Sequence, residues 1–419
     1  MVTNRRKFLA TSLIGGLAAT VPISTFGRKL SGDPKLRYEE LDEILKQPVL
    51  KKELFASPVI IETLELLRYK NSFLCRVRST DGATGMSVSN NSQMKSFYPV
   101  FVNRLQSFFI GKDAREFESL LEEAYVYDSN YKFQSLALWV PMATIEFAIL
   151  DMLGRIADKS MGQLIGEIHH PFVNFYQANS ERDITEEQVL EDLHKQLAIS
   201  NTKALKFKLG GRMSHPEFPP DRSARLIPLA RKIFGDDMHL FADANGSYTA
   251  EEAIRIGKLL QEYKYEHYEE PVPFDWYEET KQVADALTIP IAGGEQEASM
   301  HNFRWLIAND ALQIVQPDVY YFGGMIRSMR VARMANAFGK LCTPHISGGL
   351  GYLYMMHFIS AVPNAGPYHE FKGNNKEVPL ECKTSSLLIE NGVMKVPTGP
   401  GSGIDIDPEF IKRHEVVKA

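Results

Sequence analysis

Seven residues able to act as acids, bases or metal ligands stand singly at the ends of short apolar runs in the second half of the chain. Neighbouring members of this row are roughly 25 residues apart, the length that one strand, one helix and two short loops require. The row mixes bases with carboxylates, so it could hold a cation and move protons. Its members are Lys208, Asp243, Glu269, Glu295, Asp318, His345 and Glu370.

A barrel of alternating strands and helices would position this row. A TIM barrel occupies about 250 residues and builds its active site where the C-terminal ends of its strands meet. A single carboxylate after an apolar run is more often a solvated loop charge or a helix cap. Seven in one period are not explained that way. We therefore predict an α/β protein with a (β/α)8-type, modified TIM barrel over residues 171–384.

Three carboxylates of the row, Asp243, Glu269 and Glu295, come from consecutive predicted strands and can converge on one cation. Oxygen ligands of this kind suit Mg²⁺, and no close cysteine or histidine pair favours zinc. Glu270 competes with Glu269 for the same place. Because alternation along a strand puts the two on opposite faces, only one of them should bind the metal.

Two possible bases flank the carboxylates. Lys206 and Lys208 project from one face of a predicted strand, with Phe207 on the other. Neighbouring ammonium groups depress each other's pKa, so one of these lysines could be a base near neutral pH. On the other side, Asp318 beside His345 would fix the imidazole tautomer and raise its basicity.

A metal between two bases suits the removal of a proton α to a carboxylate. The metal would stabilise the enediolate that forms. The opposite base could then return a proton, which gives racemisation, or expel a β-hydroxyl as water, which gives dehydration. The residues alone leave both outcomes open.

With these motifs, nearly the whole chain resembles the enolase superfamily, and within it the mandelate racemase subgroup of acid-sugar dehydratase type. The resemblance is carried by Lys206-Phe207-Lys208, Asp243-Ala244-Asn245, Glu269-Glu270-Pro271, Gly294-Glu295, Gln316-Pro317-Asp318, Pro344-His345 and His369-Glu370. It implies Mg²⁺ on Asp243, Glu269 and Glu295, with Lys208 as one base and His345 with Asp318 as the other.

The resemblance also implies residues that bind the substrate. Glu370 would donate a hydrogen bond to the substrate carboxylate, and Lys206 would orient that carboxylate and tune Lys208. Asn245 would lie beside the metal and the substrate. Arg212 could bind a distal carboxylate or hydroxyl, although a surface loop arginine is the commoner situation. A homo-oligomer is implied as well.

The resemblance favours a carbon–oxygen lyase that dehydrates a sugar acid, with a racemase or epimerase of a 2-hydroxy acid as the alternative. A third reading is a carbohydrate-binding protein without catalysis, which the presence of both bases and all three ligands disfavours. The polar segment Ser89–Gln93 would suit a polyol better than an aromatic acid. A small-molecule carboxylate is therefore the expected substrate.

The N-terminal half reads as a separate α+β capping domain, residues 32–170. Strands are expected near 58–67, 73–78 and 86–88, a polar loop at 90–92, and helices over 97–109, 114–125 and 137–153. Gly323-Gly324 would let the backbone approach a ligand and would open a helix near Ile326. Residues 385–419 would leave the barrel and pack back on the capping domain.

Composition excludes some classes. The net charge is −5 and no basic stripe occurs, so nucleic-acid binding has no support. Cys75, Cys342 and Cys382 are widely spaced and read as buried free thiols.

Residues 1–31 resemble a twin-arginine signal peptide. Arg5-Arg6-Lys7-Phe8-Leu9 precedes a short apolar region. We expect export to the periplasm without stable membrane insertion after processing. No other stretch approaches the ~20 apolar residues of a membrane span.

Overall fold

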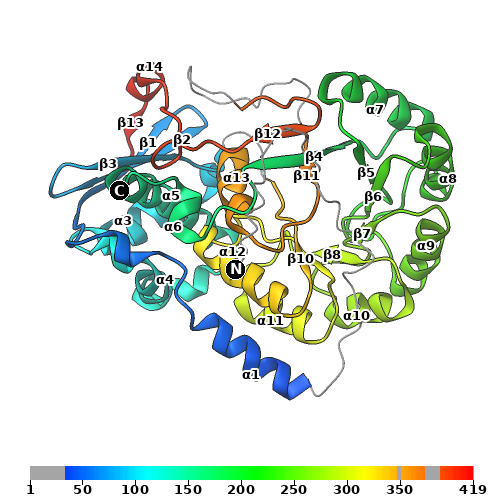
Figure 1. Ribbon diagram of the computed structural model, residues 1–419, viewed down its shortest axis with the longest axis horizontal. Helices are drawn as coiled ribbons and strands as arrows, with labels where there is room; N and C mark the ends of the chain where they lie inside the picture. The colour runs from blue at the N-terminus through cyan, green and yellow to red at the C-terminus, as the bar shows by residue number, and fades with distance from the viewer. Residues whose placement is uncertain (1–33, 347–350, 373–386, 419) are drawn as a thin grey trace, which may run out of the picture.

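The computed structural model describes residues 34–346, 351–372 and 387–418 of the 419-residue chain. The expected signal peptide and Cys382 lie outside these residues. Figure 1 shows the N-terminal domain on the left and the strands and helices of the barrel on the right.

The N-terminal domain contains the predicted three-stranded meander. Strands β1 (Ile61–Tyr69), β2 (Ser72–Ser79) and β3 (Thr84–Val88) pair antiparallel in chain order. A fourth strand, β13 (Glu415–Val416), comes from the C-terminus and pairs with β1 through Leu67 and Val416. The end of the chain is thus part of the sheet of this domain.

The helices of the N-terminal domain differ from the expected ones mainly at their starts. The polar loop expected at 90–92 is wrong, because Asn90 is an N-cap whose side chain accepts a hydrogen bond from the Gln93 N–H. The helices are α1 (Pro34–Leu45), α2 (Asn91–Val100), α3 (Gln106–Phe109), α4 (Phe117–Val126), α5 (Leu136–Ala157) and α6 (Met161–Ile165). Shorter turns are η2 (Lys52–Leu54), η3 (Phe101–Leu105), η4 (Ala114–Glu116) and η5 (Tyr127–Phe133).

Helix α5 is the central helix of this domain. By length and composition alone this helix could cross a membrane, with a mean hydropathy of 1.7. The expectation that no stretch beyond the N-terminus has enough apolar residues for a membrane span is therefore wrong. However, 89% of that apolar window is buried inside the protein. Its hydropathy is accounted for by packing on β2, β3 and α2.

The barrel has eight parallel strands among the described residues, in the spatial order β10-β9-β8-β7-β6-β5-β4-β11. Between β10 and β11, the Cys342 N–H donates a hydrogen bond to the Asn364 carbonyl. The Gly366 N–H, just before β11, donates to the Cys342 carbonyl. The strands are β4 (Phe172–Ala178), β5 (Ala204–Lys208), β6 (His239–Asp243), β7 (His267–Glu269), β8 (Ile291–Gly293), β9 (Ile314–Val315), β10 (Leu341–Cys342) and β11 (His369–Phe371).

One helix follows each of the first seven barrel strands. The first of these helices begins directly after Thr185, because Thr185 and Gln188 form a capping box at its N-terminus. Phe207 faces these helices, so Lys206 and Lys208 face the barrel interior. The helices are α7 (Glu186–Ser200), α8 (Arg222–Phe234), α9 (Ala250–Glu262), α10 (Tyr277–Ala286), α11 (Met300–Ala308), α12 (Met325–Ala337) and α13 (Gly351–Ala361).

The C-terminal segment contacts both parts of the protein. Its strand β12 (Val393–Lys395) pairs antiparallel with β4 of the barrel. The Ser402 N–H then donates to Asp151 of α5 at 2.8 Å, before α14 (Pro408–Lys412) and β13. The segment therefore ties the barrel to the N-terminal domain.

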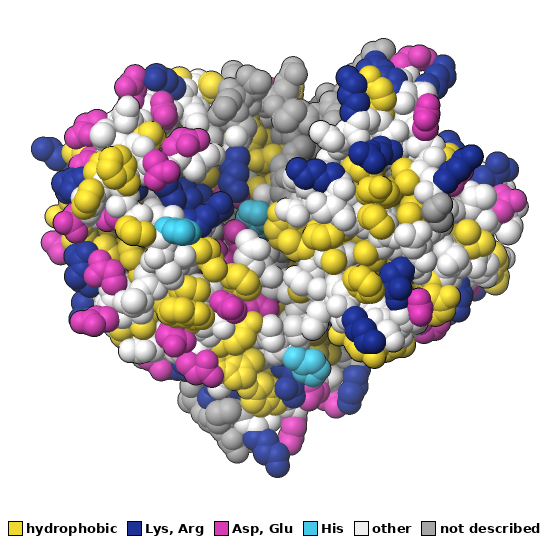
Figure 2. Space-filling model, turned by 180° about the vertical axis from the view of Figure 1, so that it is seen from behind, with side chains coloured by type: hydrophobic (Ala, Val, Ile, Leu, Met, Phe, Trp, Pro, Cys, Tyr) yellow, Lys and Arg dark blue, Asp and Glu magenta, His cyan; other side chains and the backbone are white. Residues whose placement is uncertain are grey.

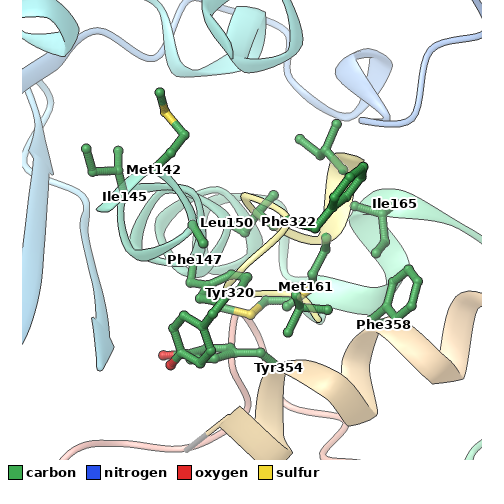
Figure 3. Close-up of a cluster of buried hydrophobic side chains, with 14 of the residues drawn as sticks. Met142, Ile145, Phe147, Leu150, Met161, Ile165, Tyr320, Phe322, Tyr354 and Phe358 are labelled. Atoms are coloured by element: carbon green, nitrogen blue, oxygen red, sulfur yellow. The ribbon is translucent and has the colours of Figure 1, made fainter. Parts of the chain in front are cut away.

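Buried side chains also join the two parts. Figure 3 shows Phe147 of α5 against Tyr320, which follows β9, and against Tyr354, which lies on α13. The ring centroid of Phe147 lies 5.1 Å from that of Tyr320 and 4.1 Å from that of Tyr354. The loop after β9 is thus packed against the helix at the centre of the N-terminal domain.

Gly323 and Gly324 serve this contact, and the expectation that they make room for a ligand stays a prediction. A Cβ at Gly323 would lie 2.5 Å from the Trp139 ring, and one at Gly324 would lie 2.2 Å from the Glu146 carboxyl carbon. Both glycines also have positive φ. They allow α5 to approach the start of α12, the helix expected there.

Candidate active site

Three members of the predicted row lie side by side on adjacent strands. Lys208 is the register partner of Asp243, and Asp243 is the partner of Glu269. Each ends its strand, so all three side chains reach the C-terminal mouth of the barrel. Their side chains are almost completely buried.

The other four members complete the ring at the same end. Glu295, Asp318 and His345 follow β8, β9 and β10 by two or three residues, and Glu370 is within β11. Even the most accessible of them, His345, has a side chain only 12% exposed. Sequence spacing therefore located a set of charged groups that the fold brings together.

Lys206 occupies the floor of this ring. Its ammonium forms ion pairs at 2.8 Å with both Glu269 and Glu370. Burial alone would lower the pKa of Lys206, but these two carboxylates raise it well above its usual range. The expectation that neighbouring lysines depress it is wrong for Lys206, because carboxylates outnumber the cations around it.

Lys208 is held by Asp243 and by the amide of Asn245. Its ammonium pairs with Asp243 Oδ2 and donates to Asn245 Oδ1 at 3.1 Å. Asn245 in turn donates from its amide nitrogen to Glu270 Oε2 at 3.1 Å. Asn245 thus fixes a lysine on one side and a carboxylate on the other.

His345 and Asp318 form a pair on the opposite side. His345 Nδ1 lies 2.7 Å from Asp318 Oδ2, and its Nε2 lies 3.5 Å from Glu295 Oε2. Burial would lower the pKa of His345, but Glu295 and the Asp318 hydrogen bond raise it. The other oxygen of Asp318 accepts from the N–H groups of Tyr320 and Tyr321, which fixes the carboxylate.

Glu270 directly follows β7 and is influenced electrostatically by Glu295, Asp243 and Glu269. Its backbone has φ 41°, so the chain leaves the extended conformation directly after Glu269. Burial raises the pKa of Glu270 well above its usual range, and Glu295 and Asp243 raise it further. Alternation therefore does not apply to Glu270, which lies beyond the end of β7.

Among the described residues, no three or more His, Cys, Asp or Glu side chains are grouped closely enough to hold a metal ion. The ammonium groups of Lys206 and Lys208 lie against Glu269 and Asp243. The donor chemistry nevertheless fits Mg²⁺, because several buried carboxylates repel one another at this place. Glu270 Oε1 is also buried without a hydrogen-bond partner in this structure.

Residues 188–410 match the family described as enolase C-terminal domain-like. The chain belongs to the enolase superfamily. Its relatives and its fold assign it to the mandelate racemase subgroup of that superfamily.

Curated relatives of this enolase superfamily member act on sugar acids or their derivatives. Arabinonate dehydratase of Saccharolobus solfataricus is 24% identical over 332 residues, which cover 79% of this chain and 87% of the relative. D-galactarolactone cycloisomerase of Agrobacterium fabrum is 26% identical over 320 residues, 74% of this chain and 82% of the relative. In agreement with these relatives, the chain is an enzyme, either a lyase or an isomerase.

Solved structures have the same architecture. A candidate racemase from Roseobacter denitrificans is 30% identical, with a TM-score of 0.78 over 85% of this chain and 99% of the other. A mandelate racemase/muconate lactonizing protein from Paracoccus denitrificans, in complex with magnesium, has a TM-score of 0.76 at 21% identity, over 86% and 99%.

Two basic residues of this superfamily member were missed by the sequence reasoning. Arg182, in the loop after β4, donates to Asn245 Oδ1. Lys372 follows β11 and lies 2.7 Å from Glu370. Arg212, the predicted arginine, is exposed and has φ 73°. Its backbone N–H donates a hydrogen bond to the Ser247 hydroxyl. Both missed residues follow barrel strands, and Lys372 is two residues from Glu370, so alternation could have indicated it.

Proposed function

We propose that this enzyme dehydrates a sugar acid by removing the proton α to the carboxylate and expelling a β-hydroxyl as water. The observation that carries the proposal is the placement of two bases on opposite sides of one carboxylate cluster. Lys208 stands beside Asp243 on one side, and His345 stands beside Asp318 and Glu295 on the other. A substrate between them can lose a proton on one face and accept one on the other.

Asp243, Glu269 and Glu295 would hold Mg²⁺, consistent with their oxygen donors and with the magnesium complex of the Paracoccus relative. When bound, the ion supplies Lewis-acid stabilisation of the negative charge that develops on the substrate carboxylate. Glu270 would stay outside this set and accept from Asn245.

The protein's own groups then have separate tasks. Lys208 Nζ takes the α-proton, and Asn245 keeps that nitrogen at the mouth of the barrel. His345 Nε2 gives a proton to the departing hydroxyl, while Asp318 holds the Nδ1 side of the ring. Lys206 at the floor balances the charge of Glu269 and Glu370.

Racemisation or epimerisation of a 2-hydroxy acid is the second candidate. It is favoured by the 30% identical candidate racemase from Roseobacter denitrificans. It uses the same two bases, with His345 returning a proton to the α-carbon instead of to a hydroxyl. The two reactions differ in whether the product has lost water.

Mass spectrometry of products formed in deuterated water separates the candidates. The Mg²⁺-loaded enzyme is incubated with a panel that includes D-arabinonate, D-xylonate and D-galactonate. We expect loss of water from one acid, abolished in Lys208→Ala and His345→Asn. Lys395→Ala and His194→Asn, on β12 and α7, are matched controls that should keep activity. Deuterium gain without water loss would instead establish the racemase, and neither result across the panel would refute the sugar-acid proposal.

We further propose that the enzyme is exported by the twin-arginine route and works in the periplasm as a homo-oligomer. The paired Arg5 and Arg6 before Phe8-Leu9 support export. Replacing both arginines by lysine should retain the protein in the cytoplasm, as followed by cell fractionation. Light scattering of the purified protein tests the assembly.

A further inference from the structure

A cavity of about 350 Å³ lies where the N-terminal domain meets the barrel. Its walls come from α4 and α5 on one side and from α11 and α12 on the other, and the end of α1 also contributes. The positions of these helices can be followed in Figure 1. The residues of the ring at the barrel mouth are not part of its walls, so the cavity is separate from the candidate active site.

Arg327 of α12 is a buried cation that lines this cavity. The residue is 6% exposed, and its guanidinium donates to the backbone carbonyls of Phe322 at 2.7 Å and Ala298 at 2.9 Å. Within the described part of the chain it forms no ion pair, and its Nη1 makes no hydrogen bond. Exposed lysine and arginine side chains, by contrast, are interspersed with acidic ones over the face shown in Figure 2. A buried charge without a partner is uncommon, because desolvation of the charge is costly.

Two further donors at the cavity lack an acceptor. Trp139 of α5 is 3% exposed, and its indole N–H makes no hydrogen bond to any described residue. The Arg327 guanidinium lies over the indole, 3.7 Å from its centroid, which holds the two side chains together. Arg330 Nε is also buried without a hydrogen-bond partner. The cavity therefore has more donors than the protein itself uses.

The first turn of α11 supplies a positive end to the same cavity. Ser299 is the N-cap of this helix, and its side chain caps none of the N–H groups of the first turn. The N-terminus of a helix carries a partial positive charge and favours an anion. Together with the unpaired guanidinium, this indicates an anionic ligand.

The charges nearby favour an anion that carries a single charge. Glu118 and Glu122 pair with Arg330 at 3.1 and 3.2 Å and would repel a dianion. Burial lowers the pKa of Arg327 to about 10, so this guanidinium is still charged at neutral pH. A carboxylate has one charge and can accept from several N–H donors at once.

We propose that this cavity binds a small organic monocarboxylate, which accepts hydrogen bonds from the Arg327 guanidinium and the Trp139 indole N–H. Its carbon chain would lie against Leu45 and Met300, which also line the cavity. A volume of about 350 Å³ is in the range of small-molecule sites. The ligand would contact both domains at once. The site is additional to the ring and does not depend on the reaction proposed above.

Tryptophan fluorescence tests this binding directly. The chain has three tryptophans, so Trp276→Phe with Trp305→Phe leaves Trp139 as the only reporter. This protein is titrated with sodium butyrate in EDTA, so that no Mg²⁺ attracts the acid to the ring, and NaCl keeps the ionic strength constant. We expect a saturable change in emission with butyrate. Neutral butyramide and inorganic phosphate should give no saturable change.

Two variants in the same background remove the site in different ways. Arg327→Met should weaken butyrate binding about 10-fold or more, as expected for the loss of a charged hydrogen bond. Ser299→Leu narrows the cavity, removes no cap hydrogen bond and should abolish the response. Urea denaturation shows whether each variant is folded, and Ser299→Leu decides the matter if Arg327→Met is not. Arg255→Met, on α9 and outside the cavity, is the matched control and should bind butyrate normally.

Each result either supports or overturns the site. A saturable response to butyrate alone, weakened in every folded cavity variant and retained in the control, supports it. No saturable response to butyrate, or an equal response to butyramide, overturns it. So does an unchanged butyrate affinity in either folded cavity variant. A stronger response to phosphate than to butyrate overturns the assignment to a monocarboxylate.

Discussion

The Tyr320 hydroxyl donates a 2.6 Å hydrogen bond to the backbone carbonyl of Val88. Tyr320 follows Asp318 by two residues, and its own N–H donates to the Asp318 carboxylate at 2.7 Å. Val88 is the last residue of β3 in the capping sheet, and its N–H donates to the Tyr354 hydroxyl. The carboxylate that holds His345 is therefore fastened to the capping domain through one tyrosine.

Tyr320→Phe should lower both stability and activity. The substitution leaves the Val88 carbonyl buried without its donor, which costs about 1–3 kcal/mol. Because the same loop positions Asp318, kcat should also fall several-fold. Urea denaturation and initial-rate kinetics measure the two effects.

Tyr265→Phe is the matched control for that experiment. The buried Tyr265 hydroxyl donates to the Ile227 carbonyl at 3.2 Å, within the barrel and away from the His345 pair. It should cost similar stability without changing kcat in the folded enzyme. An equal loss of kcat in both variants would show that Tyr320 acts through general stability alone.

Removal of single carboxylates should identify the Mg²⁺ ligands. Asp243→Asn, Glu269→Gln and Glu295→Gln should each weaken Mg²⁺ binding at least about 10-fold, whereas Glu270→Gln should change it little. Calorimetric titration with MgCl₂ measures this directly. At 100 times its Kd, the ion should stabilise the parent enzyme by about 2.7 kcal/mol, a gain that EDTA removes.

The comparison of Glu269→Gln with Glu270→Gln is the decisive pair. Both side chains are buried, neighbours in sequence and close to the same negative charges. Loss of binding in Glu270→Gln with retention in Glu269→Gln would mean that the residue after the strand, not the one that ends it, is the ligand.

Sequence spacing predicted the ring because one strand and one helix repeat with little variation in length. That regularity puts Lys208, Asp243 and Glu269 at the ends of successive strands, and in the structure they are register partners. Period-two alternation likewise indicated the three-stranded meander of the capping domain. These features depend on local periodicity, which a single sequence displays.

Details that depend on a backbone angle or on distant contacts were not predictable in this way. Glu270 leaves the extended conformation with φ 41°, and the other carboxylates raise its pKa. The glycines before α12 meet Trp139 and Glu146, which are far away in sequence. The pKa of Lys206 depends on how many carboxylates surround it. Alternation and spacing contain none of this information.

The two described cysteines should be unreactive in the native protein. Cys75 and Cys342 are free and fully buried, and burial raises the pKa of both thiols well above the ordinary range. Because the thiolate is the reactive form, iodoacetamide should label neither residue at pH 8 without denaturant and both in 6 M guanidinium. Peptide mass mapping gives the result for each site, and native labelling of either would contradict the packing.

Glu146 should make stability depend on pH. It is fully buried on α5, where it accepts from the N–H groups of Met325 and Ile326 at the start of α12. Burial raises its pKa to about 8, from a usual value near 4.5. A group whose pKa is raised on folding stabilises the protein at low pH and loses that contribution as pH rises through the folded value. Stability should therefore fall between pH 5 and pH 9, by on the order of 3–5 kcal/mol from this residue.

Glu146→Gln isolates that contribution, because the amide oxygen can still accept from both N–H groups but cannot ionise. Urea denaturation at pH 5, 7 and 9 should show the variant close to the parent at pH 5 and more stable than the parent at pH 9. Glu62→Gln, on an exposed position of β1, should follow the parent at every pH. A constant difference between Glu146→Gln and the parent across this range would mean that Glu146 is ionised throughout, with its charge balanced by the N-terminus of α12.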